Sequence, residues 1–224
     1  MSARVGVVVF PGTNCEQDVA WAIETIGGSA EMLWHSDRAL RGVDAVVLAG
    51  GFAYGDYLRT GAIARFSPVM EAVASFAAEG GPVVGICNGF QILTEAGLLP
   101  GALQKNAGLK FRCETVEIRV ETTESALTTL AETGQILRIP INHFEGNFVC
   151  DRETLARLRD LDQVVFRYLK NPNGSLDDVA GICDEGRNVV GLMPHPERAS
   201  EPVLGSADGA VLLRSLLAAA SVAA

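Results

Sequence analysis

Short apolar runs alternate with amphipathic segments through the first half of the chain, and this alternation constrains the fold more than any other feature. The runs of strand length are residues 4–10, 43–51 and 82–86, with a shorter run around residues 30–34. Strands that are apolar on both faces must be covered on both sides, and the segments between them can supply the covering helices. The pattern predicts an α/β fold in which a doubly wound, mainly parallel sheet is flanked by helices.

The segments between these runs carry the signals of helices. Residues 14–26 have apolar side chains at helical spacing and end at a pair of glycines. A second helix is expected to have Ser67 as its N-cap and Pro68 as its first residue. Residues 88–96 predict a third helix directly after the run at 82–86.

The second half of the chain differs because its apolar residues alternate with polar ones. The clearest alternation lies in residues 111–121 and 135–144, and two shorter runs follow at residues 163–169 and 178–184. Alternation of this kind is typical of antiparallel strands with one exposed face. We therefore expect antiparallel additions at the edge of the sheet, and a closing helix over residues 208–219.

Composition narrows the class of protein. With 224 residues, 48% of them hydrophobic, the chain can bury a large core, and we expect one domain over residues 1–224. The formal net charge of −9 argues against a nucleic-acid partner or an anionic membrane surface, since both need a concentrated basic face. The N-terminal apolar run is too short for a signal peptide or a membrane span, which indicates a cytoplasmic protein. Five scattered cysteines without a CxxC pair fit a reduced chain with no metal site.

One short motif, GICNG at residues 85–89, places Cys87 between two glycines directly after an apolar strand. Ligands of open parallel sheets gather at the carboxyl ends of the strands. The motif is built like a nucleophile elbow, in which small neighbours let a strand turn sharply into a helix. The start of that helix favours a thiolate, and the backbone N–H of Asn88 becomes a candidate oxyanion donor. Alone, however, the motif is more often a buried structural cysteine.

A nucleophilic thiol needs a base, and the chain has three histidines: His35, His143 and His195. His195 follows an apolar run, and Glu197 comes two residues later. In an extended segment residues i and i+2 share a face, and the proline between the two favours extended geometry. We therefore predict a triad in which Cys87 is the nucleophile, His195 the base and Glu197 the group that orients the base.

Two glycine-containing loops are expected near the same site. Gly51 follows a buried strand, and its N–H is a second candidate oxyanion donor. Cys15 lies at the start of an expected helix, a position that activates thiols. No histidine lies near Cys15 in the sequence, so we interpret Cys15 as structural.

Together these residues resemble the class I, or triad-type, glutamine amidotransferases, whose signatures are a cysteine elbow (here GICNGFQIL) and a late His-x-Glu (here HPE). The likeness continues through FPGTNCEQD, GGFAYGDYLRTGAIARFSP, NPNGSLDDVAGI and GLMPHPERA, from about Val5 to Gly209. One departure lies in INHFEGNF at residues 141–148, where family members often have IAHGEGNF. Asn142 and Phe144 are bulkier than the residues usual there, whereas His143 and Glu145 are kept.

The resemblance implies that Cys87 attacks the side-chain amide of L-glutamine, that a γ-glutamyl thioester forms, and that Gln91 helps to hold the substrate. Helical periodicity alone leaves Gln91 on the helix surface. The long motifs resemble the branch of the family whose ammonia passes to a synthetase subunit, and a further partner there is a small accessory subunit. In that branch ammonia converts formylglycinamide ribonucleotide to its amidine in purine biosynthesis, and ATP and magnesium are expected in the synthetase.

No cofactor is expected in this chain, which lacks a G-x-x-x-x-G-K-[ST] loop. The loops at residues 12–18 and 53–62 are expected to be exposed near the site, and they are candidates for the subunit contact and for gating.

Three other interpretations remain open from the sequence. A cysteine hydrolase or peptidase could act on γ-glutamyl or small peptide substrates without transferring ammonia, and its activity would not depend on a partner. A non-catalytic regulatory or scaffolding subunit could keep the fold, although the intact triad residues argue against it. A redox sensor on Cys87 is a more remote interpretation, because the chain has no resolving-cysteine motif.

Overall fold

One mixed sheet organises the molecule. The computed structural model describes residues 2–223, so the end residues 1 and 224 of the expected domain lie outside the described residues. The strand order is β2-β1-β3-β4-β11-β10-β9-β6-β7. The parallel half comprises β2 (Ser29–Trp34), β1 (Arg4–Val9), β3 (Ala45–Leu48), β4 (Val83–Ile86) and β11 (Val189–Leu192). The antiparallel half comprises β10 (Val179–Cys183), β9 (Val164–Tyr168), β6 (Arg112–Val120) and β7 (Ile136–His143).

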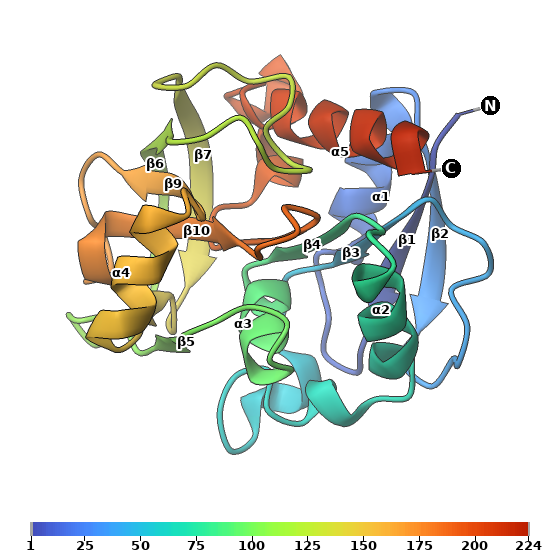
Figure 1. Cartoon of the computed structure of the whole chain (residues 1–224), viewed down its shortest axis with the longest axis horizontal. Coiled ribbons are helices and arrows are strands. Elements are labelled where there is room, and N and C mark those ends of the chain that lie inside the picture. The colour runs from blue at the N-terminus through green and yellow to red at the C-terminus, as the bar shows by residue number, and fades with distance from the viewer. Residues whose placement is uncertain (1, 224) are drawn as a thin grey trace.

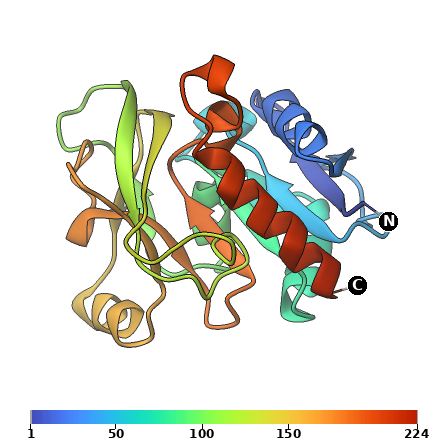
Figure 2. The same ribbon diagram turned by 90° about the horizontal axis from the view of Figure 1, so that it is seen from above.

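Helices cover both faces of the parallel half. In Figure 1, α1 (Glu16–Thr25) and α5 (Gly209–Ala223) lie on one side of the sheet, while α2 (Val69–Ala78) and α3 (Asn88–Glu95) lie on the other. Figure 2, seen from above, shows α5 crossing the strands diagonally. The expected α/β fold, doubly wound with antiparallel additions at one edge, is therefore confirmed. The parallel strands β1, β3, β4 and β11 are almost wholly buried, which is why they read as continuous apolar runs, whereas the edge strand β2 is partly exposed.

Two small features were not expected. Helix α4 (Arg152–Asp160) packs beside the antiparallel half, and the Asp151 carboxylate caps it by accepting from the Thr154 N–H at 2.7 Å. Strands β5 (Ala102–Gln104) and β8 (Asn147–Val149) form a separate two-stranded sheet.

The start of α2 corrects one expectation. Ser67 has an extended backbone and Pro68 a helical one, as predicted. The Ser67 hydroxyl does not cap the helix, however, because it forms a 2.9 Å hydrogen bond with the Tyr54 hydroxyl instead. That tyrosine lies in the short 3-10 segment η1 (Ala53–Asp56), so Ser67 ties α2 to the loop after β3.

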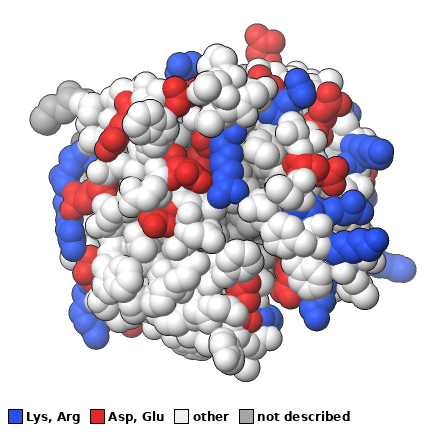
Figure 3. All heavy atoms as spheres, turned by 180° about the vertical axis from the view of Figure 1, so that it is seen from behind, with Lys and Arg blue, Asp and Glu red and all other residues white. Residues whose placement is uncertain are grey.

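Acidic and basic side chains are interspersed on the face shown in Figure 3. Within residues 2–223, none of the helices combines the length and the hydropathy that crossing a bilayer requires.

Candidate active site

The turn after β4 explains both glycines of the cysteine motif. Cys87 adopts φ 52° and ψ −104°, a strained conformation for a residue with a side chain. A Cβ on Gly85 would lie 2.6 Å from the backbone of Gly89, and a Cβ on Gly89 would lie 1.9 Å from the Leu48 carbonyl oxygen. The strand, the turn and α3 are thus packed backbone to backbone, and only glycine fits at these two positions.

Strand pairing brings the other predicted residues to this turn. Strand β11 lies next to β4 in parallel, with Leu192 opposite Ile86, so the chain leaves both strands at the same edge of the sheet. His195 follows β11, and its Nδ1 lies 2.6 Å from Glu197 Oε1. Both side chains are buried.

The backbone between these two residues differs from the extended segment predicted. His195 instead opens a short 3-10 helix, η4 (Pro196–Ala199), in which the proline occupies the first turn. The chain tightens at this point because proline at the first helical position is compatible with helical φ. The carboxylate reaches the imidazole from within the first turn of this helix and not from the same face of a strand.

Charge stabilises a protonated imidazole at this position. Burial lowers the pKa of His195, but the Glu197 carboxylate and the nearby thiols of Cys87 and Cys15 raise it by more. The net effect holds the His195 pKa well above its usual value of 6.5.

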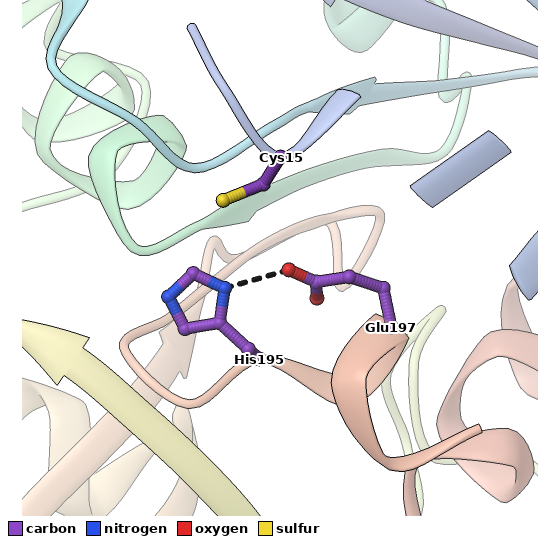
Figure 4. Close-up of side chains that lie close together, drawn as sticks. All are labelled: Cys15, His195 and Glu197. Carbon is purple, nitrogen blue, oxygen red and sulfur yellow. Dashed lines mark hydrogen bonds and ion pairs between the residues drawn. The ribbon is translucent and has the colours of Figure 1, made fainter. Parts of the chain in front are cut away.

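Cys15 lies closer to the triad than its sequence position indicated. Figure 4 shows its thiol beside the imidazole of His195, and one ligand atom from each of Cys15, His195 and Glu197 lies within 4.8 Å of the others. The Cys15 Sγ also accepts a 3.1 Å hydrogen bond from the Arg198 guanidinium. The distance of Cys15 from any histidine in the sequence therefore did not predict its distance in the fold. The loop at residues 12–18, which was expected to be exposed, is buried at Cys15, which is 2% exposed.

Gly50 lies close to His195 and to both cysteines. A Cβ at this position would lie 2.8 Å from His195 Cε1 and 3.2 Å from Cys15 Sγ. The same Cβ would lie 3.5 Å from the Cys87 Cβ. His195 is thus flanked by two cysteines, and any side chain at position 50 would displace it.

Cys87 is the thiol that faces a pocket. A cavity of about 60 Å³ is lined by Gly51, Phe52, Asp56, Thr60, Cys87, Gln91, Asn142, His143, Phe144 and Glu145. The Cys87 thiol donates to the backbone carbonyl of Asn142 at 3.7 Å. The loop that departs from the family pattern therefore forms one wall of the cavity, with Asn142 and Phe144 in it.

The three predicted substrate-binding residues surround the elbow. Gly51 lines the pocket with φ +150°, and a Cβ there would lie 2.7 Å from the Cα of Thr13. Asn88 is fully buried at the first turn of α3, and its Oδ1 accepts from the Ala53 N–H at 3.0 Å. The first N–H groups of a helix have no partner within the helix, which leaves the backbone N–H of Asn88 suited to an oxyanion.

Gln91 is not the helix-surface amide that periodicity alone allowed. It is 4% exposed and lines the pocket. Its Oε1 accepts from Asn88 Nδ2 at 2.9 Å, and its Nε2 donates to the Glu145 carbonyl. The Gln91 side chain therefore ties α3 to the loop after β7.

Sequence reasoning did not select Asp56, Thr60 or Glu145, which also line the pocket. The sequence offered a weak signal for Asp56 and Thr60, since the loop at residues 53–62 was expected near the site, and for Glu145 in the loop that departs from the family pattern. The third histidine, His35, is satisfied by a 2.8 Å hydrogen bond between its Nδ1 and the Tyr54 hydroxyl.

Comparison with known proteins agrees with this geometry. A family model described as a CobB/CobQ-like glutamine amidotransferase domain matches residues 2–209. The phosphoribosylformylglycinamidine synthase subunit PurQ of Rubrobacter xylanophilus is 59% identical over 219 residues, 98% of this chain and 100% of the relative. The chain belongs to the PurQ family of glutamine amidotransferases.

Other members of the PurQ family give the same picture. The PurQ subunit from Koribacter versatilis is 55% identical over 226 residues, covering 96% of this chain and 98% of its own. Among solved structures, a chain of PurLQS from Thermotoga maritima superposes with a TM-score of 0.90 at 42% identity, covering 97% of this chain and 99% of that one. A second glutamine amidotransferase from Thermotoga maritima shares the fold, with a TM-score of 0.58 at 18% identity over 100% of this chain and 94% of that one. The expected family and enzyme class are thus confirmed.

Proposed function

We propose that Cys87, His195 and Glu197 form the triad with which this enzyme hydrolyses the side-chain amide of L-glutamine. The observation that carries the proposal is the left-handed Cys87 turn at the wall of a pocket, next to a buried imidazole held 2.6 Å from a carboxylate. A strained nucleophile, a base and an orienting acid at the end of neighbouring strands are the parts that acyl transfer needs.

The reaction proceeds through two acyl-transfer steps. The Cys87 thiolate attacks the side-chain carbonyl carbon of glutamine, and the carbonyl oxygen takes the electron pair while the backbone N–H groups of Asn88 and Gly51 donate to it. The C–N bond then breaks, His195 gives its proton to the nitrogen, and ammonia leaves. Water attacks the γ-glutamyl thioester, His195 takes the water's proton, and the C–S bond breaks to release glutamate.

The ammonia serves a partner. The chain is the glutaminase subunit of phosphoribosylformylglycinamidine synthase, and a synthetase subunit uses the ammonia to convert formylglycinamide ribonucleotide to its amidine. ATP and magnesium belong to that synthetase, and a small accessory subunit completes the complex. The likeness to named PurQ subunits and to a chain of PurLQS supports this assignment.

The rim of the pocket supports the subunit contact expected for residues 53–62. Tyr57 is 75% exposed and Leu58 89% exposed, directly after the pocket residue Asp56. Large apolar side chains gathered beside a catalytic pocket are typical of an interaction surface. Movement of this loop on docking would change the pocket wall, which is how we expect the partner to gate the site.

The same proposal includes one domain over residues 1–224 and a cytoplasmic location. The single sheet joining the first strand to β7 supports one domain. The five cysteines, all free within the described residues, fit a reducing compartment.

Ammonia release from glutamine tests the function and separates the two thiols. The assay compares the purified protein alone with its complex with synthetase, ATP and formylglycinamide ribonucleotide. We expect strong stimulation in the complex, abolished by Cys87→Ala while that complex still accepts free ammonia. Cys15→Ala is the matched control and should retain glutaminase activity.

Each alternative gives a distinct result in the same assay. Undiminished release in Cys87→Ala, with loss in Cys15→Ala, would make Cys15 the nucleophile. Hydrolysis that depends on Cys87 but not on any partner would favour a stand-alone hydrolase. Absence of turnover in the wild-type complex would favour a non-catalytic role.

A further inference from the structure

Strand β6 is paired along almost its whole length on one side, but along only part of its length on the other. It pairs with β7 over residues 112–119. Its pairing with β9 covers residues 118–120, and one more backbone hydrogen bond runs from the Leu169 N–H to the Glu117 carbonyl at 3.0 Å. Within residues 2–223, no strand lies on that side of residues 112–116. These residues form an open edge at the antiparallel end of the molecule, on the left in Figure 1.

The open edge has backbone groups with no strand to pair with. In an antiparallel ladder, the N–H and C=O of every second residue point to the same neighbouring strand. The Glu117 carbonyl accepts from Leu169 on the β9 side. The N–H and C=O of Thr115 and Cys113, two and four residues earlier in the same strand, therefore point to that side as well. A row of N–H and C=O groups without ladder partners is a template for a further strand.

A groove lies beside the open edge. It has a volume of about 480 Å³, with residues of β6 along one side and residues 170–172 along the other. Asn171 holds the second wall in place, because its Nδ2 donates to the Ser175 carbonyl at 2.8 Å and to Asp178 Oδ1 at 2.9 Å. Pro172 has no N–H with which to extend the β9 ladder. An extended segment would therefore enter a groove that exists before it binds.

The side chains around this groove are more basic than acidic, on a chain whose formal net charge is −9. Arg112, Arg138 and Lys170 line it, together with Glu114 and Glu117. Arg112 lies 3.7 Å from Glu114, yet its Nε is a buried donor without an acceptor. Among the described residues, neither Arg138 nor Lys170 takes part in an ion pair. Carboxylates on an incoming segment would supply the missing acceptors.

We infer that the open edge of β6 is the docking site of an extended, acidic segment of a protein partner, which adds a strand beside Thr115. In this mode of recognition, main-chain hydrogen bonds supply affinity and the flanking side chains supply specificity. A second copy of this chain fits less well, because a symmetric contact would bring the basic side chains of the two copies together. The groove shares no residue with the Cys87 pocket, so the inference goes beyond the proposed function and does not depend on it.

A short peptide in which threonine and glutamate alternate is the probe. It is added to about 1 mM, because ordering a flexible peptide costs affinity. We expect the amide hydrogen exchange of Cys113 and Thr115, followed by NMR, to slow by about 10-fold or more, since their N–H groups become hydrogen-bonded. The same peptide with lysine in place of glutamate is the control and should leave the exchange rates unchanged.

Two substitutions locate the contact. Thr115→Pro removes the N–H that points to the groove, a change that edge positions tolerate, and should weaken peptide binding by about 10-fold. Thr115→Ala keeps that N–H and should bind like the wild type. Lys170→Glu should also weaken binding by about 10-fold, because it repels the glutamates, and it decides the question if Thr115→Pro does not fold. Its matched control is Arg38→Glu, since Arg38 is also exposed but follows β2, at the opposite edge of the sheet.

Any of four results would overturn the inference. Unchanged exchange of Cys113 and Thr115 with the glutamate peptide would mean that the edge accepts no strand. Equal losses of binding in Thr115→Pro and Thr115→Ala would mean that the side chain, and not the backbone, makes the contact. Equal protection by the lysine peptide, or undiminished binding to Lys170→Glu, would mean that the occupant is not selected by its acidic charge. Protection that rises with protein concentration in the absence of peptide would assign the edge to a second copy.

All of these measurements concern binding at β6. The proposed function is tested separately, by ammonia release, so a failure of the docking site would leave it unaffected.

Discussion

Replacing Asp56 with asparagine should make the free protein more stable at neutral pH. The pKa of this carboxyl is raised from 3.8 to about 6, so the folded state binds its proton more tightly than the unfolded state. Stability from this group is fully present below pH 3.8 and is lost as the pH rises through about 6. Asparagine carries no charge, so the variant does not lose this stability as the pH rises.

The magnitude follows from the raised pKa. At ~1.36 kcal/mol per pH unit, the difference between 3.8 and about 6 corresponds to ~3 kcal/mol at pH 7. The residue is only partly buried, so solvent screening reduces this figure to about 1 kcal/mol. For a domain of this size, ~1 kcal/mol corresponds to an increase of roughly 2–4 °C in Tm.

Thermal or urea unfolding of the free subunit between pH 5 and pH 8 measures the effect. The advantage of Asp56→Asn over the wild type should grow as the pH rises. Asp177→Asn is a control of opposite sign, because hydrogen bonds from Arg159 and Arg167 hold the pKa of Asp177 below its usual value, and that variant should be destabilised at pH 7. The reasoning is refuted if Asp56→Asn is less stable than the wild type at pH 8, or if its advantage does not vary with pH.

Three further substitutions test the geometry of the elbow and the triad. Gly50→Ala should lower kcat about 100-fold by displacing the ring of His195. The control is Gly108→Ala, which should change neither kcat nor Tm because the new Cβ would lie 3.8 Å from its nearest neighbouring atom. Gly89→Ala should lower the free energy of unfolding by ~3 kcal/mol or more, since its Cβ would overlap a carbonyl oxygen of β3. A urea midpoint equal to that of the wild type would contradict this. Glu197→Gln should move the alkaline limb of the pH profile of kcat/KM to lower pH by removing the charge that raises the His195 pKa, and an unmoved limb would count against that role.

The parallel half of the fold could be predicted from the sequence because its inner strands are buried on both faces and helices α1, α2 and α3 end at glycines. Strands β6 and β7 were also recognisable, since one face of each is exposed, whereas β9 and β10 are buried and read only as short apolar runs. Helix α4 was missed because its apolar side is narrow, with Leu158 as its buried residue. The Asp151 cap was visible in the sequence, but a capping residue without a clear apolar stripe is a weak signal.

The elbow could be predicted for a different reason. Cys87 and its two glycines lie within five adjacent residues, so the need for small neighbours at this turn can be recognised from the local sequence alone. The position of Cys15 beside His195 and the meeting of Asp56 with Glu145 could not be predicted in this way. Each of these pairs is brought together only by the folding of distant segments. The local sequence around a cysteine or a carboxylate in a loop does not indicate which residue will lie next to it.

The pairing of β4 with β11 also sets when the enzyme becomes active during its synthesis. Roughly a hundred residues separate Cys87 from His195, which at ~5–20 residues per second corresponds to about 5–20 s on the ribosome. Until β11 joins the sheet, the nascent chain has Cys87 without the imidazole of His195, and one edge of β4 lacks its neighbour. With the proposed triad, hydrolysis of glutamine begins only after residue 197 of the 224 has been made, and a chain that stops before His195 should release no ammonia.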